Sequence, residues 1–233
     1  MIDIKQAKDR FRTKLDWLDS WHSFSFGHHF DAENQGHGLL IVSNDDWIRG
    51  GGAFGTHPHR DMEIVTWVLS GTLEHKDTAG NHGIITPGVA QRMSAGRGIS
   101  HSEANADADE DLHLVQMWVL PDTTGIDPGY EERDINERLA AGGLVAVASG
   151  QGHEGAVTIH QRGAVLWAAR LAAGERVEIP AGTHVHVFAA VGGVDLEGAG
   201  SLAEGDAARL TDEGALGLTA GPEGAEVLVW VTD

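Results

Sequence analysis

The stretch Thr56–Gly71, THPHRDMEIVTWVLSG, joins a His-x-His pair to a run of apolar and β-branched residues that ends in Ser70-Gly71. Such a run between turn residues is typical of a buried strand. Residues at i and i+2 point to the same face of a strand, so His57 and His59 share a face. The stretch therefore predicts a β-protein with two imidazoles side by side.

A second pair, His101-Ser102-Glu103, follows the tight bend Ala95–Gly98. If the two segments face each other inside a barrel, three imidazoles and one carboxylate converge. Such ligands suit Fe, Mn, Ni, Cu or Zn better than Ca or Mg. The chain has no cysteine and no His-Glu-x-x-His helix, which excludes other common zinc signatures. The predicted ligands of one divalent transition metal are His57, His59, His101 and Glu103.

Composition narrows the class of function. The chain has 233 residues, with 35 acidic and 16 basic side chains and a formal net charge of −19. So acidic a surface repels phosphate backbones, which argues against unaided nucleic-acid binding. Without cysteine there is neither a disulfide framework nor thiol catalysis.

Nothing in the chain predicts export or membrane insertion. Residues 1–15, MIDIKQAKDRFRTKL, lack the apolar core of a signal peptide. No run approaches the roughly 20 apolar residues of a membrane span. We expect a cytoplasmic protein without membrane contact.

Short apolar runs separated by turn residues continue along the whole chain, which contains 32 glycines. In the C-terminal half the turns recur at intervals of about 8–12 residues, the spacing of β-sandwiches and barrels. One exception is Pro128–Ala141, PGYEERDINERLAA, whose Glu and Arg content and Leu139 favour a short helix. The pattern predicts an all-β protein of two similar units joined by this helix.

Four blocks resemble the pirin family of the cupin superfamily, in its bacterial quercetinase-like branch. They are SWHSFSFG at Ser20–Gly27, THPHRDMEIVTWVLSG at Thr56–Gly71, ITPGVAQRMSAGRGISHSE at Ile85–Glu103 and LHLVQMWVLP at Leu112–Pro121. The resemblance implies a bicupin, with two tandem antiparallel β-barrels of the cupin or jelly-roll type. We expect a metal-binding barrel in residues 1–130 and a degenerate barrel in residues 131–233.

The resemblance also implies a ligand set and a reaction. The family pattern of His-x-His plus His-x-Glu falls on the same four residues, and iron is the metal it favours, with Cu, Ni, Mn, Co or Zn as alternatives. The implied reaction is 2,3-dioxygenation of quercetin, a planar aromatic substrate, with O₂ uptake, ring opening and release of carbon monoxide. Glu103 is the expected catalytic residue, because a carboxylate beside the metal can take the substrate proton.

Two other functions stay open at this point. One is a metal-binding regulatory protein that acts through a protein partner, a role to which the resemblance also points. The other is a cupin isomerase or hydrolase that uses the metal without O₂. A monomer is the expected state of the chain.

Several further residues allow more than one interpretation. Parity places Glu63 on the same strand face as His57 and His59, so it is a rival ligand, a partner of a ligating imidazole or a structural group. The His-x-His at His184 and His186 has no later histidine to complete a ligand set, which favours a structural or pocket role. The candidates for the lining of an apolar pocket, or for plain core, are Phe24, Phe26, Phe54 and Met93. The histidines without ligand spacing, which we expect at the surface or packed, are His22, His28, His29, His37, His75, His82, His113, His153 and His160.

Overall fold

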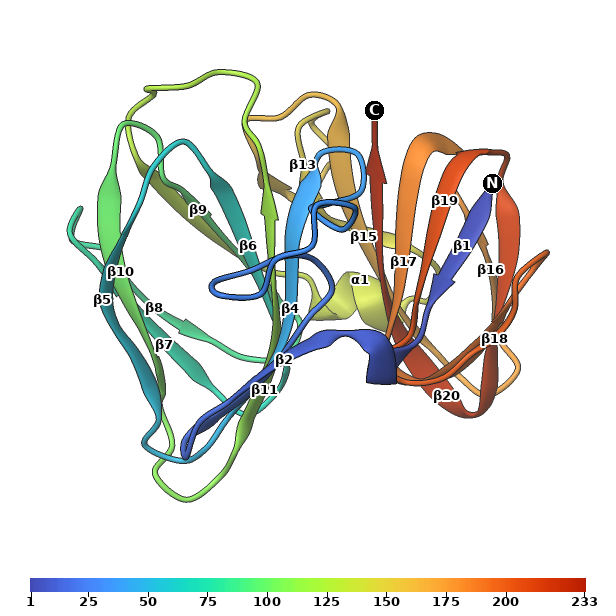
Figure 1. Ribbon diagram of the computed structural model, residues 1–233, viewed down its shortest axis with the longest axis horizontal. Helices are drawn as coiled ribbons and strands as arrows, with labels where there is room; N and C mark the ends of the chain where they lie inside the picture. The colour runs from blue at the N-terminus through green and yellow to red at the C-terminus, as the bar shows by residue number, and fades with distance from the viewer.

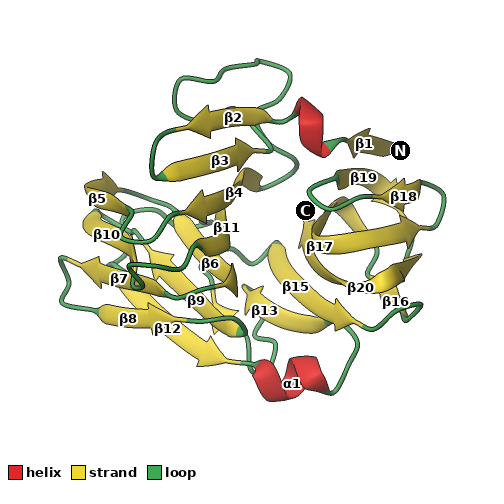
Figure 2. Cartoon of the chain, turned by 90° about the horizontal axis from the view of Figure 1, so that it is seen from below, coloured by secondary structure: helices red, strands yellow, loops and turns green.

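The computed structural model describes all 233 residues, and its regular secondary structure is almost entirely β-strand, with one short α-helix. Figure 1 shows two β-barrels side by side, with α1 (Asn136–Ala140) between them. The only other helix is the 3₁₀ turn η1 (Ala7–Asp9), drawn red with α1 in Figure 2. None of the helices has the length and apolar character that a membrane crossing requires. The prediction of an all-β bicupin with a short connecting helix is confirmed.

Two sheets enclose the first barrel. The seven-stranded sheet runs, in spatial order, β12 (Gly129–Asp134), β9 (Val89–Ser94), β6 (Glu63–Ser70), β11 (Leu112–Val119), β4 (Leu40–Ile48), β3 (Leu18–His22) and β2 (Phe11–Lys14). The four-stranded sheet runs β5 (Ala53–His59), β10 (Ile99–Asn105), β7 (Leu73–Asp77) and β8 (His82–Ile85). Because β5 is an edge strand, Pro58 can lie within it without breaking a central ladder.

One nine-stranded sheet forms the second barrel. Its main path runs β1 (Ile2–Lys5), β19 (Ala207–Glu213), β17 (Gly182–Leu196), β20 (Leu216–Thr232), β15 (Ala164–Leu171), β13 (Val145–Ser149) and β14 (Val157–Thr158). In addition, β16 (Arg176–Ile179) pairs with β20 and β18 (Gly200–Leu202) pairs with β17. All pairs are antiparallel except β13 with β14.

The N-terminal segment crosses from one barrel to the other. Strand β1 pairs with β19 of the second barrel, with Ile2 opposite Leu210, before β2 joins the first barrel. Between them, the Arg10 guanidinium lies 5.4 Å from the ring centre of Phe188 and 3.0 Å from Asp45. At the other edge, β12 carries the first barrel's sheet on to Asp134. The division into residues 1–130 and 131–233 stays a prediction.

The helix expected over Pro128–Ala141 is wrong in its first half. Residues Gly129–Asp134 form β12, and only Asn136–Ala140 are helical. The open edge of β9 accounts for the difference, since β12 pairs with all of it and places the Tyr130 ring against His75. Tertiary pairing outweighs the modest helix propensity of Glu and Arg.

The largest apolar cluster lies between the barrels and takes residues from both. Trp67 of the first barrel and Phe188 and Trp230 of the second belong to this cluster of 23 buried residues. Its polar atoms are paired across the seam, because Trp67 Nε1 donates to Glu226 Oε1 at 2.7 Å. The two barrels therefore share a core.

Candidate metal centre

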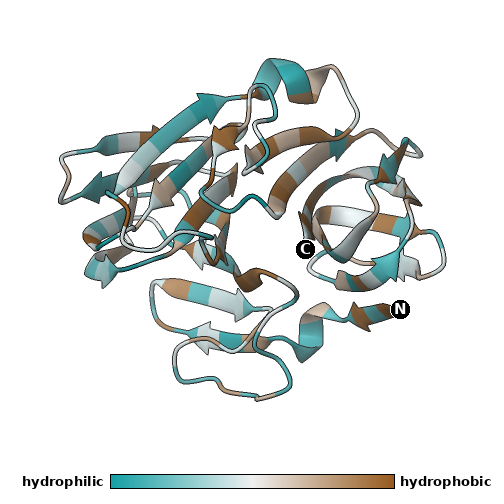
Figure 3. Ribbon diagram, turned by 90° about the horizontal axis from the view of Figure 1, so that it is seen from above, coloured by the Kyte–Doolittle hydropathy of each residue, from teal (hydrophilic) through white to brown (hydrophobic).

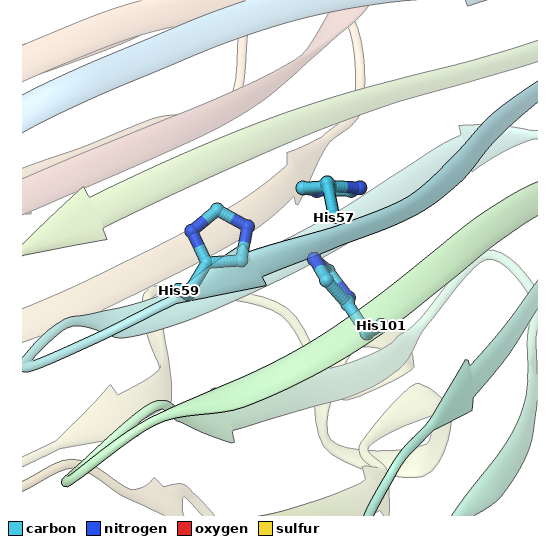
Figure 4. Close-up of side chains that lie close together, drawn as sticks. All are labelled: His57, His59 and His101. Carbon is cyan, nitrogen blue, oxygen red and sulfur yellow. The ribbon is translucent and has the colours of Figure 1, made fainter.

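Strands β5 and β10 bring three imidazoles together. The strands pair antiparallel, with His57 opposite His101 and His59 opposite Ile99. The ring centres lie 4.5 Å apart for His57 and His101, and 4.9 Å apart for each of the other two pairs. One nitrogen from each ring lies within 4.8 Å of the others (Figure 4). This is the convergence that the two sequence pairs predict.

The free nitrogens of these rings fit a metal ion. Nε2 of His59 and Nε2 of His101 are buried and have no hydrogen-bond partner. The Nδ1 atom of His57 bonds to the carbonyl oxygen of Gly55 at 2.8 Å, which leaves its Nε2 available. Buried nitrogens without partners are unfavourable unless something binds them. A divalent transition metal is a suitable occupant, because neutral imidazole is its preferred nitrogen ligand.

Burial keeps the imidazoles of His59 and His101 neutral. It lowers the pKa of His101 to about 2, aided by the nearby His57, His59 and His75. It also lowers the pKa of His59 to about 4, with His57 adding to the effect. Metal binding requires deprotonated ligands, so neither ring has to lose a proton at neutral pH.

Glu103 lies next to the three-histidine cluster, on the side of His101 that faces His75. The β5–β10 register shifts between His101 and Glu103. One carboxylate oxygen of Glu103 lies within 4.8 Å of a ring nitrogen of His75 and of a ring nitrogen of His101. Gln116 Nε2 donates to both carboxylate oxygens, at 2.9 and 2.8 Å. Burial raises the pKa of Glu103, and the bonds from Gln116 oppose that rise. Glu103 is therefore a fixed carboxylate that borders the imidazoles.

His75 is part of this site, although sequence spacing gave it no role. Its Nδ1 lies 3.3 Å from Nδ1 of His101, and its Nε2 lies 3.4 Å from Oδ2 of Asp77. If Nε2–H of His75 donates to Asp77, its Nδ1 must accept from Nδ1–H of His101. His101 then keeps a lone pair on Nε2 for a metal. The missed signal is the i, i+2 pair His75 and Asp77, which shares one strand face.

A cavity of about 450 Å³ opens onto the candidate ligands. His57, His59 and Glu103 line it, so the cluster is accessible to a small molecule. Its aromatic wall is continuous with the site, since the Trp118 ring meets the His59 ring edge-on at 4.9 Å. The other aromatic residues of the lining are Trp17, Phe26 and Phe54.

Two of the four residues considered for the pocket lining contribute to it. Phe26 and Phe54 line the cavity, and so does His28. Phe24 instead belongs to the apolar cluster between the barrels, where its ring contacts His186 and Arg209 of the second barrel. Met93 belongs to a small buried apolar cluster.

Glu63 lies away from the imidazoles, so the parity argument for a shared face is wrong. The chain turns at Asp61, with φ of 48°, and Glu63 begins β6 in the opposite sheet. Its Oε2 accepts from Ser94 Oγ at 2.8 Å and from the backbone N–H of His160 at 3.0 Å. Glu63 thus has a structural role and ties the first barrel to the second.

The second His-x-His lies on the outer face of its barrel. Along β17, Val185 and Val187 belong to the aliphatic core of the second barrel, whereas His186 and Phe188 face the seam. His184 meets the ring of His37 at 5.1 Å. No third ligand joins the pair, since both metal-compatible groups of the structure include His101.

Comparison with known proteins places the chain in a family. Residues 5–119 match the family model described as Pirin, and residues 146–230 match the model of the quercetinase C-terminal cupin domain. A Mycobacterium tuberculosis protein named "Putative quercetin 2,3-dioxygenase" is 54% identical over 230 residues, which are 98% of this chain and 94% of the relative. The quercetin 2,3-dioxygenase of Escherichia coli K12 is 46% identical over 161 residues, 69% of this chain and 68% of that protein.

Solved structures agree with this placement. YhhW from Escherichia coli superposes with a TM-score of 0.93 at 38% identity, over 100% of this chain and 98% of that one. A nickel(II) complex of the same bacterial pirin superposes with a TM-score of 0.91, over 100% and 99% of the two chains. The chain therefore belongs to the pirin family, as a bicupin of the bacterial, quercetinase-like kind.

Proposed function

We propose that this protein is a metal-dependent dioxygenase of flavonol or related enol substrates, of the quercetin 2,3-dioxygenase type. The observation that carries the proposal is the pair of buried, unpartnered imidazole nitrogens of His59 and His101, together with an aromatic cavity that His59 lines. Relatives named quercetin 2,3-dioxygenase support the choice of reaction.

In this proposal His57, His59, His101 and Glu103 hold one divalent metal. Three neutral imidazoles and one carboxylate leave such an ion with a net positive charge, and it would act as a Lewis acid and template for the substrate oxygen. Iron is the metal expected from the family resemblance. The nickel(II) complex of the Escherichia coli relative shows that this family can hold a different one.

The side chains of the cavity then have separate tasks. Trp118 and Phe26, whose rings meet edge-on at 5.6 Å, offer an apolar surface to a planar ring system and exclude water from it. Glu103 takes the proton of the reacting hydroxyl, so that the O–H bond breaks and its electron pair stays on the substrate oxygen. Gln116 keeps the carboxylate in place through its two hydrogen bonds. The overall reaction consumes O₂, opens the ring and releases carbon monoxide.

The test is anaerobic reconstitution with one metal at a time, followed by O₂ uptake with quercetin. We expect uptake matched by carbon monoxide release for at least one metal, and its loss in His57→Ala and Glu103→Ala. If both variants keep full activity, the assigned site is wrong. Tight metal binding without uptake for any metal would favour a regulatory protein that works through a protein partner.

A further inference from the structure

Two neighbouring carboxyl groups on β4 have opposite surroundings. Asp45 pairs with Arg10 at 3.0 Å and with His113 Nε2 at 2.6 Å. Asp46 points to the other strand face, has no ion pair, and lines the cavity together with Glu103. Its Oδ1 atom is buried and has no hydrogen-bond partner. The first carboxylate has two ionic partners, whereas one oxygen of the second is left without a partner.

An unpaired buried carboxyl group destabilises a protein unless a ligand satisfies it. Burial raises the pKa of Asp46 to about 7, and the charges of Asp45 and Glu103 raise it further while Ser20 and Arg10 oppose them. No basic side chain of the cavity forms an ion pair with this group, because the only basic residues of the lining are histidines that bond elsewhere or not at all.

Ser20 can reach one side of the Asp46 carboxyl group, and the other polar side chains nearby are paired with one another. Ser20 faces Asp46 across the β3–β4 ladder. Nδ1 of His22 bonds to Asn44 Oδ1 at 2.9 Å, and its Nε2 bonds to Thr13 Oγ1 at 2.9 Å. This wall of the cavity therefore offers Asp46 as its principal free acceptor, beside the aromatic side chains described above.

A carboxyl group that borders an aromatic cavity selects a planar ligand that carries a hydrogen-bond donor. We propose that Asp46 is a specificity-determining residue, which accepts a hydrogen bond from a ring hydroxyl of the substrate other than the hydroxyl that reacts. The preferred substrates are then planar aromatics with several hydroxyl groups. The inference rests on the proposed function, because that function places the substrate in this cavity.

Two flavonols test the contact. Quercetin has ring hydroxyls in addition to the reacting one, whereas 3-hydroxyflavone has the reacting hydroxyl alone. In Asp46→Ala we expect the ratio of kcat/KM for quercetin to that for 3-hydroxyflavone to fall about two- to tenfold, the effect of losing one hydrogen bond. Asp46→Asn, which keeps an acceptor oxygen, should retain part of the preference.

The matched control is Asp45→Asn, the neighbouring carboxylate on the other face. It should lower stability, because Arg10 and His113 lose their partner, and leave the substrate ratio unchanged. Metal content should stay at the wild-type level in all three variants. An unchanged ratio in Asp46→Ala would overturn the assignment.

Failure of the proposed function has a different signature. If the wild type turns over neither flavonol, that function is wrong, and binding of the same two compounds is then measured by quenching of tryptophan fluorescence. A preference for quercetin that disappears in Asp46→Ala still supports the contact. Equal affinities for the two compounds in the wild type would contradict it.

Discussion

The two barrels of this chain share an architecture but have different interiors. The first barrel encloses buried polar side chains, among them His75, His101, Glu103 and Gln116, and a cavity of about 450 Å³. The interior of the second is a cluster of 16 buried residues, all of them aliphatic, such as Val185, Leu210 and Leu218. Figure 3 shows the same contrast, with more hydrophilic colour on the strands of the first barrel. The buried polar groups of the first barrel lower the stability of the fold, and the apolar packing of the second barrel raises it.

The His-x-His pairs make the comparison sharper. His57 and His59 point into the first barrel, towards His101, whereas His186 points out of the second barrel, towards Phe24. A His-x-His pair on a strand can therefore bind a metal only when it faces the barrel interior and further ligands lie opposite it.

Removal of an inward imidazole should abolish activity. For His101→Ala we expect quercetin turnover to fall at least about a thousandfold, since a bound metal contributes several kcal/mol of transition-state stabilisation. His184→Ala, in the second barrel, is the matched control and should keep turnover within about threefold. Steady-state O₂ uptake measures both, and equal losses in the two variants would show that the barrels do not differ in this way.

Truncation of the aliphatic interior should act on stability alone. Leu218 is fully buried in the second barrel, and Leu218→Ala should lower the free energy of unfolding by about 2–5 kcal/mol. Urea denaturation followed by circular dichroism measures the change. Metal stoichiometry without denaturant should be unaffected, and loss of metal from this folded variant would mean that the second barrel shapes the site.

Disruption of the Asp77–His75–His101 chain should weaken metal binding without abolishing it. We expect His75→Phe to reduce metal affinity about 10- to 100-fold, because the partner that orients His101 is lost. His75→Gln, which can still accept from His101, should recover part of the affinity. Competition with a chromophoric chelator measures this, and wild-type affinity in His75→Phe would assign His75 a packing role only.

Acid should destabilise the metal-free protein through the same imidazoles. The pKa of His59 falls from an unfolded value of 6.5 to about 4, so the unfolded chain binds more protons between those values. The contribution of His59 to stability is present above pH 6.5 and is lost as the pH falls towards 4. Chemical denaturation at several pH values in this range gives the free energy of unfolding as a function of pH. This free energy should fall less steeply with decreasing pH in His59→Asn than in the wild type. An equal dependence on pH in the two proteins would mean that His59 is not desolvated.

Sequence patterns predicted the strands, the two similar β-units and the imidazole cluster because these depend on local alternation and on short motifs, and the resemblance to the pirin family added the two barrels. The strand at Gly129–Asp134 and the separation of Glu63 from the imidazoles were missed. Each depends on turns or on an open sheet edge that pairs distant segments. Asp46 and His75 were missed for a related reason, since only the fold shows that Asp46 lacks a partner while Asp45 has two.

The most direct test of the contrast between the barrels is the number of metal ions that each chain binds, measured by elemental analysis after reconstitution and removal of free metal. We expect one ion per wild-type chain, none in a chain that carries both His57→Ala and His101→Ala, and one in a chain that carries both His184→Ala and His186→Phe. Two ions per wild-type chain, or loss of the ion from the second-barrel variant, would contradict the assignment of the metal to the first barrel.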